Sequence, residues 1–235
     1  MPAARGAAEP GGRFSRVVLP LALGLLLLTL ALPRLVAAIA ELPARPVLEA
    51  LRLGQPQSLP RLQAAAGALG AALEHGDEAR LWNGLAVLRQ QQALLAGLGE
   101  GPGAALLQDA ATAAARALVL APGDGYAWAR LAEAQLRLRG PGEAVAAFAR
   151  ALALSPNDLG RLWQQLDLGL ALWPSLPAEQ RLALPGLLRE AARRNPHQLS
   201  WLAARRHALG PVREALAADA ELLARFDAAY RSRRL

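Results

Sequence analysis

The feature that most limits how this chain can fold is a self-similarity at a spacing of 34 residues. Asp109–Asp124 reads DAATAAARALVLAPGD, and Glu143–Asp158 reads EAVAAFARALALSPND. Both segments are alanine-rich and end in a turn that contains proline. Identical pairs include Ala110/Ala144, Arg116/Arg150, Ala117/Ala151, Leu118/Leu152 and Pro122/Pro156. A repeat of this length predicts stacked helical hairpins, in which each unit buries its apolar side against the next.

Composition agrees with an all-α fold. Hydrophobic residues make up 54% of the chain, and much of that share is Ala and Leu, which favour helices. Residues that favour strands are scarce. The absence of Cys excludes disulfides and thiolate chemistry. Every basic residue is Arg, which we interpret as a coding bias, so the net charge of +7 is read mainly as Arg dispersed over solvated helix faces.

The stretch 125–158 is the best-formed unit. Its first helix carries a bulky Trp, its turn reads RGPG, and its second helix carries one Phe among small residues. Small residues let two helix backbones approach closely, and the two aromatic rings fill the remaining space. The positions assigned to packing are Trp128, Leu131, Ala132, Ala144, Phe148, Ala151 and Pro156, the last of which ends the unit.

This pattern resembles the tetratricopeptide repeat, although Gln135 stands where an aromatic residue is usual. The other hairpins are looser. Trp82 with Leu85, then Trp163, and then Trp201 are each expected to open a hairpin and to pack inside it. The resemblance implies a tetratricopeptide-like α-solenoid over residues 62–235.

Insertions and breaks are expected within these hairpins. GLGEGPG at 97–103 lengthens the first, and WPSLPAEQ at 173–180 lengthens the third, whose second helix should end near Asn195. The GP pair at 210–211 should break the fourth. A last helix from Val212 to about Tyr230 has an apolar side that suits a cap over the end of the stack.

An uncharged apolar run, Val17–Pro33, precedes the repeats. Its length as a helix is about 26 Å, and continuing to Ala40 gives about 36 Å, enough for a hydrocarbon core of about 30 Å. The run has no polar face, so we expect a membrane helix over 17–40. AIA at 38–40 resembles a signal-peptidase site, and the sequence leaves cleavage after Ala40 open, but the length of the run favours a retained anchor.

The flanking segments set the expected orientation. Residues 1–16 should be disordered, because the start of the chain is rich in Gly, Pro and Ala. They should be cytoplasmic, because Arg5, Arg13 and Arg16 give a weak positive-inside bias. Residues 41–61 should form a Pro-rich linker, with a short helix near 46–53. The expected location is therefore a bacterial inner membrane, crossed once, with the repeat domain in the periplasm.

No residues suggest catalysis. His75, His197 and His207 lack the spacing of a helical metal site, so we expect no metal, no cofactor and no enzymatic activity. The arginines at 193–194, 205–206 and 231–234 could bind an anionic polymer or lipid, although solvated helix faces explain them as well. Aromatic residues are not interleaved with these arginines, which argues against nucleic acid as a partner.

The resemblance implies a scaffold that binds one or more proteins or peptides in a concave groove. The first helices of the hairpins line that groove in the family, so Arg130, Glu133 and Arg137 are the expected partner-binding residues. The third hairpin resembles repeat-containing accessory proteins of exopolysaccharide or O-antigen assembly. The alternatives are an assembly factor for another envelope complex, such as in cytochrome c maturation, and a polymer-binding subunit of an envelope enzyme. The oligomeric state stays open.

Overall fold

The computed structural model describes residues 11–97, 101–155 and 159–232. Over these residues the chain is helical and contains no strand, which confirms the all-α prediction. Short 3-10 turns at Leu159–Arg161 and Trp173–Ser175 connect some of the helices. The helices are α1 (Gly11–Glu41), α2 (Arg45–Arg52), α3 (Leu59–Leu73), α4 (Ala79–Ala96), α5 (Pro102–Leu120), α6 (Gly125–Arg139), α7 (Pro141–Leu154), α8 (Leu162–Leu172), α9 (Ala178–Arg181), α10 (Leu184–Arg194), α11 (Pro196–Arg205), α12 (Leu209–Leu216) and α13 (Ala220–Ser232).

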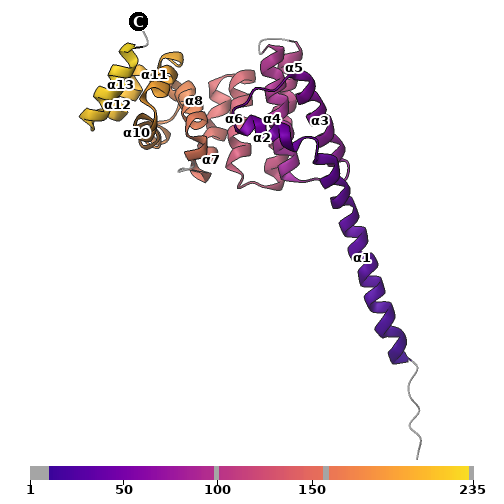
Figure 1. Cartoon of the computed structure of the whole chain (residues 1–235). Coiled ribbons are helices and arrows are strands. Elements are labelled where there is room, and N and C mark those ends of the chain that lie inside the picture. Colours follow the sequence, from indigo (N-terminus) through magenta and orange to yellow (C-terminus); the bar gives the residue numbers. More distant parts are fainter. Residues whose placement is uncertain (1–10, 98–100, 156–158, 233–235) are drawn as a thin grey trace, which may run out of the picture.

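Helix α1 projects from the rest of the molecule as one long rod (Figure 1). Residues 18–35 are exposed along its whole circumference. The segment Val18–Glu41 is long and apolar enough to cross a membrane, in agreement with the predicted apolar helix. Residues 11–16 already belong to α1, so the predicted disorder of 1–16 is wrong for this part; residues 1–10 lie outside the described ranges.

The C-terminal end of α1 is built into the folded domain. Ala37 and Ala44 are fully buried in a core cluster with residues of α3 and α4, and Glu41 is only 8% exposed. Helix α2 confirms the short helix expected near 46–53. The prediction that 41–61 is a linker is corrected, because Glu41 and Ala44 are buried in the domain and α3 begins at Leu59. Pro46 and Pro60 stand in the first turns of these helices, where a missing N–H costs no hydrogen bond.

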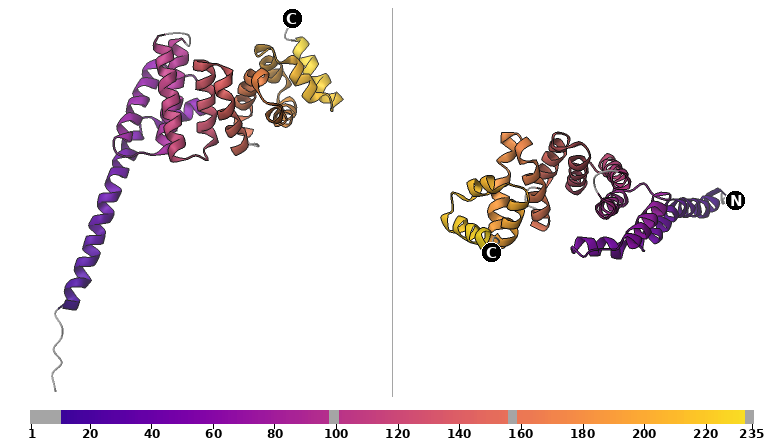
Figure 2. Two further views of the ribbon diagram at one scale, coloured as in Figure 1. Left: turned by 180° about the vertical axis from the view of Figure 1, so that it is seen from behind. Right: turned by 90° about the horizontal axis from the view of Figure 1, so that it is seen from above.

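The following helices form antiparallel pairs that stand side by side. Helix α4 packs against α5 and α6 against α7, while α5 contacts α6 and α7 contacts α8. Figure 2 shows the resulting row of helices from behind and, from above, its curved course. Gly140 alone separates α6 from α7, with a backbone φ of 88° that favours glycine.

The interior of the α6–α7 hairpin consists of the small residues noted in the sequence. Ala132 and Ala144 are 0% exposed, and Ala151 and Phe148 are 1% exposed. Pro156, predicted to end this unit, lies outside the described residues. From α6 onward a continuous core runs through α8, α10 and α11 to Phe226 of α13.

Two tryptophans form hydrogen bonds between the start of a hairpin and the turn that precedes it. The indole N–H of Trp128 donates to the carbonyl of Pro122 at 2.9 Å, and that of Trp82 donates to Asp77 at 2.6 Å. Both rings, with Leu85 and Leu131, are partly buried against clusters formed mainly by alanines of α4, α5 and α6. The hydrogen bond from Trp128 gives a physical reason for a short interval between a proline and the next tryptophan.

The fourth hairpin differs from its prediction. Trp163 is partly buried against the core, but Trp201 is 47% exposed and lies beneath the guanidinium of Arg205, 4.2 Å from its ring centroid. The packing role predicted for Trp201 is therefore wrong. Helix α11 begins at Pro196, and this register directs Leu199, Leu202 and Ala203 inward instead.

The break near the C-terminus also lies elsewhere than predicted. Helix α11 ends at Arg205, and the chain turns at His207, whose φ is 53°. The amide of Ala208 donates to the carbonyl of Ala203 at 2.8 Å. This is the closing pattern in which glycine is usual. The GP pair at 210–211 instead lies in the first turn of α12, where proline is tolerated. The last helix is divided, because the side chain of Asp219 accepts a hydrogen bond from the amide of Leu222 and starts α13.

Candidate functional site: a polar groove across α6

Four large polar side chains lie along one side of α6. Tyr126, Arg130, Glu133 and Arg137 are spaced by four, three and four residues, which places them on one face of a helix. Asp124 fixes the first turn, because its carboxylate accepts hydrogen bonds from the amides of Tyr126 at 2.8 Å and Ala127 at 3.2 Å. This face is bordered by a cleft on each side. The face and its two clefts together are called the groove across α6.

The first cleft, of about 410 Å³, lies between α4 and α6. Tyr126 is 46% exposed there, and the guanidinium of Arg161 lies 3.4 Å from its ring centroid. An exposed aromatic ring held by a stacked cation is a rigid contact for a partner. The lining residues with side chains are Ala79, Arg80, Asn83, Val87, Asp124, Tyr126 and Arg130.

The second cleft, of about 340 Å³, lies between α6, α8 and the end of α11. Its walls combine charged groups with aliphatic ones. Leu168 is almost completely buried, while Leu136 and Ala171 are half-buried. The lining residues are Glu133, Leu136, Arg137, Gln164, Asp167, Leu168, Ala171, Arg205, Arg206 and His207.

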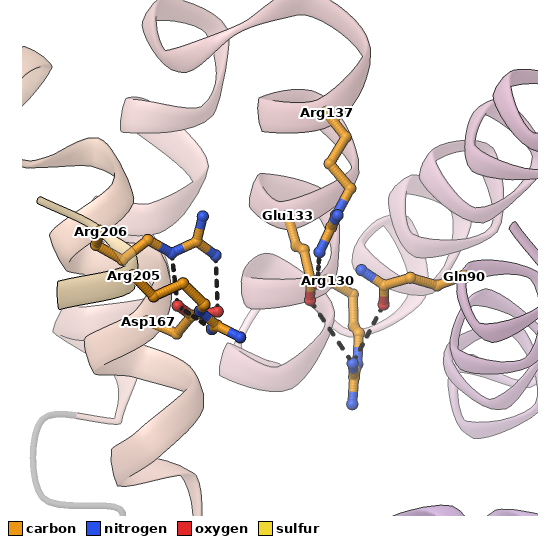
Figure 3. A network of polar contacts seen from close by, with 7 residues as sticks. All are labelled: Gln90, Arg130, Glu133, Arg137, Asp167, Arg205 and Arg206. Atoms are coloured by element: carbon orange, nitrogen blue, oxygen red, sulfur yellow. Dashed lines mark hydrogen bonds and ion pairs between the residues drawn. The ribbon is translucent and has the colours of Figure 1, made fainter. Parts of the chain in front are cut away.

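The predicted residues Arg130, Glu133 and Arg137 form one network on α6 (Figure 3). Arg137 donates to Glu133 at 3.0 Å, and Arg130 lies 3.9 Å from Glu133 and donates to Gln90 of α4 at 3.2 Å. Their side chains are only 21–26% exposed. Burial lowers the pKa of Arg130 from its usual value, but a guanidinium stays charged at physiological pH.

Figure 3 also shows a second cluster, formed by Asp167, Arg205 and Arg206, which the sequence did not predict. Arg206 binds Asp167 with two hydrogen bonds, Nε to Oδ1 at 2.6 Å and Nη2 to Oδ2 at 2.8 Å, and Arg205 lies 2.5 Å from Oδ1. Burial opposes the ionisation of Asp167, but the bonds from Arg206 and Arg205 outweigh it, so the pKa of Asp167 is lowered. The hydrogen bonds that Arg206 donates to Asp167 raise the pKa of Arg206.

Arg205 and Arg206 are one of three arginine groups for which the sequence left two interpretations open, a solvated face or an anion-binding surface. The other described pair, Arg193 and Arg194, lies on an exposed face of α10 beside Glu190. In the groove, by contrast, four guanidinium groups face the two carboxylates of Glu133 and Asp167, so the network carries an excess of positive charge.

The network leaves some hydrogen-bonding capacity unused. Within the described residues, the buried Nε of Arg137 and the buried amide nitrogen of Gln90 have no hydrogen-bond partner. Both are donors, so each lacks an acceptor in its present position. The arrangement is suited to holding polar or acidic groups.

The described part of the chain contains no group of three or more His, Asp or Glu side chains that could hold a metal ion. His75 and His197 are exposed and stand apart, in the α3–α4 turn and at the start of α11. His207 lines the second cleft, but neither of the other two histidines does. The groove therefore offers charged and hydrogen-bonding groups that can hold a ligand.

Comparison with protein-family models, with curated proteins and with solved structures finds no match to this chain.

Proposed function

We propose that this protein is a membrane-anchored scaffold that binds a partner protein or peptide in the groove across α6. The observation that carries this proposal is the pair of clefts on either side of one helix face. That face bears Tyr126, Arg130, Glu133 and Arg137, which combine an aromatic contact with charged and unsatisfied donors. The antiparallel pairs α4–α5 and α6–α7 support a tetratricopeptide-like solenoid, in which α4, α6 and α8 are the first helices of successive hairpins.

In this proposal α1 is the anchor. It crosses a bacterial inner membrane once, with the N-terminus in the cytoplasm and the helical domain in the periplasm. The exposed apolar surface of residues 18–35 supports insertion, and the arginines before the apolar run support the orientation. The domain provides binding rather than catalysis and needs no cofactor.

Exopolysaccharide or O-antigen assembly is the process that we favour, on the likeness of the third hairpin to accessory proteins of those systems. A periplasmic assembly factor, such as one for cytochrome c maturation, is the alternative within the binding class. A polymer-binding subunit of an envelope enzyme is the alternative from another class, and the excess positive charge in the groove is what favours it.

The test is capture of partners by the full chain from detergent-solubilised membranes, with quantitative mass spectrometry. Replacing Arg130 and Arg137 with acidic residues would place three carboxylates close together, because both arginines contact Glu133. We therefore use Arg130→Gln with Arg137→Gln, and Arg193→Gln with Arg194→Gln as a control that removes the same charge from α10.

We expect the groove variant to lose partner recovery about tenfold, as for residues central to an interface. The control should retain full recovery. Unfolding curves for both variants check that the domain is folded. Equal recovery by a folded groove variant and by the native protein would show that the groove is not the binding site.

A further inference from the structure

One edge of the helical domain is tied directly to the end of α1. The carboxylate of Glu41 forms an ion pair with Arg80 in the first turn of α4, and Arg80 also donates to Glu78 at 2.7 Å. The neighbouring Asp77 forms an ion pair with Arg116 near the end of α5. These contacts place the end of α1, the α3–α4 turn and the end of α5 at the same edge.

This edge exposes apolar side chains next to charges that are already paired. Val119 is 71% exposed and Leu120 is 39% exposed at the C-terminal end of α5, and Ile39 is 57% exposed on α1. Asp77 and Glu78 of the adjoining turn bind arginines within the domain. Paired charges are less costly to bring near a medium of low polarity than isolated ones.

No spacer separates the apolar helix from this edge. The segment Val18–Glu41 has 24 residues, and its burial in the domain begins at Ala37, inside that segment. A helix of this length is about 36 Å long, whereas the hydrocarbon core is about 30 Å thick. When α1 spans a bilayer, the edge of the domain must therefore lie at the headgroups.

We propose that this edge, with Val119 and Leu120 at its centre, is a membrane-contacting surface and that its occupant is the lipid bilayer. The inference rests on the proposed insertion of α1. Helices α4–α7 run roughly along α1 in Figures 1 and 2. The contact therefore holds these helices upright on the membrane, so that the groove across α6 opens sideways, toward partners at the membrane surface.

The experiment uses the full chain, which has no native Cys, in nanodiscs of phosphatidylethanolamine and phosphatidylglycerol. Single cysteines carry an environment-sensitive fluorophore at Val119→Cys, at Leu25→Cys within α1, and at Leu95→Cys. Leu95 is 58% exposed at the end of α4, which runs antiparallel to α5 and ends at the opposite edge. It is the matched control for Val119.

We expect lipids with a spin label near the headgroup to quench the fluorophore at 119, and lipids labelled deep in the chain to quench it at 25. Position 95 should respond to neither. Emission at 119 should be shifted to the blue relative to 95, because the fluorophore sits in a less polar medium.

The controls separate the two proposals. Quenching at 25, together with equal and weak quenching at 119 and 95, would overturn the membrane-contacting surface and leave the anchor in place. Absence of quenching at 25 would overturn both the insertion of α1 and the inference that rests on it. Strong and equal quenching at 119 and 95 would overturn the membrane-contacting surface as well, since the contact would then not be confined to one edge.

Discussion

Glu41, the last residue of the apolar helix α1, forms an ion pair with Arg80 in the first turn of α4. The hydrogen bond to Glu41 raises the pKa of Arg80, and Arg45 lies 3.5 Å from the same carboxylate. With Ala37 and Ala44 in the core beside it, this contact makes α1 a part of the domain rather than a tether. The end of the helix and the domain therefore form one packed unit.

We predict that Glu41→Gln destabilises the domain. The side chain of Glu41 is only 10% exposed, but Arg80 is 48% exposed and keeps Glu78, so the loss should be about 1–2 kcal/mol. Urea unfolding of the full chain in detergent, followed by tryptophan fluorescence, measures it. Glu49→Gln, which removes an exposed carboxylate 4.0 Å from Arg52, is the control and should change stability by less than about 0.5 kcal/mol. Equal midpoints for the two variants would contradict the role given to Glu41.

We predict that α1 is retained in the mature protein. The possible cleavage site at 38–40 is helical and begins directly after the buried Ala37, whereas proteases act on exposed and extended segments. Intact mass and N-terminal sequencing of the membrane fraction should show a chain that still contains 17–40. A mature protein that begins at Glu41 would show the opposite.

We predict that Gly169→Ala overpacks the contact of α8 with its neighbours. An added methyl group would lie 3.0 Å from Cδ2 of Leu184 and 3.1 Å from Cζ of Phe148, at a loss of about 1–3 kcal/mol. Gly186→Ala is the matched control in α10, because nothing lies within 4 Å of its added methyl group. That variant should be neutral or more stable by up to about 1 kcal/mol. If thermal unfolding shows Gly169→Ala to be more stable than Gly186→Ala, the packing described for α8 is wrong.

We predict that Trp128→Phe lowers the stability of the domain and that Trp128→Ala lowers it further. Trp128→Phe keeps most of the packing but removes the hydrogen bond to Pro122, at about 1 kcal/mol. Trp128→Ala also opens a cavity and should cost about 2–4 kcal/mol, below the value for a fully buried ring. Denaturant unfolding should place Phe between the native protein and Ala. A Phe variant as unstable as the Ala variant would mean that the hydrogen bond dominates.

We predict that Asp167 contributes to the acid sensitivity of the domain. Its pKa is lower in the folded state than in the unfolded chain, so its contribution is complete above the unfolded value of about 3.9 and is lost as the pH falls through the folded value. Asp167→Asn should therefore be less stable than the native protein at pH 7, and this difference should shrink below about pH 4. Unfolding midpoints between pH 7 and pH 2 measure it. A difference that is the same at both ends would exclude this linkage.

The amino-acid sequence determined what depends on neighbours along the chain. The uncharged run Val17–Pro33 required an apolar helix, and alanine and leucine at helical spacing required hairpins. The interval of 34 residues fixed the lengths of α6 and α7, together with the small residues Ala132, Ala144 and Ala151 between them. Such features follow from periodicity and side-chain volume, which act within one or two turns of helix.

The tertiary structure decided what depends on partners far apart in the chain. Asp167 meets Arg205 and Arg206 across α8 and α11, 39 residues away in the case of Arg206, and no local pattern specifies that encounter. Ala37 and Glu41 join the core only because α3 and α4 pack around them. The outward position of Trp201 and the turn at His207 follow from the register of α11, which is set by the burial of Leu199 and Leu202. A pairing of distant groups is settled by which surfaces the whole fold brings together, and the sequence states only which groups are available.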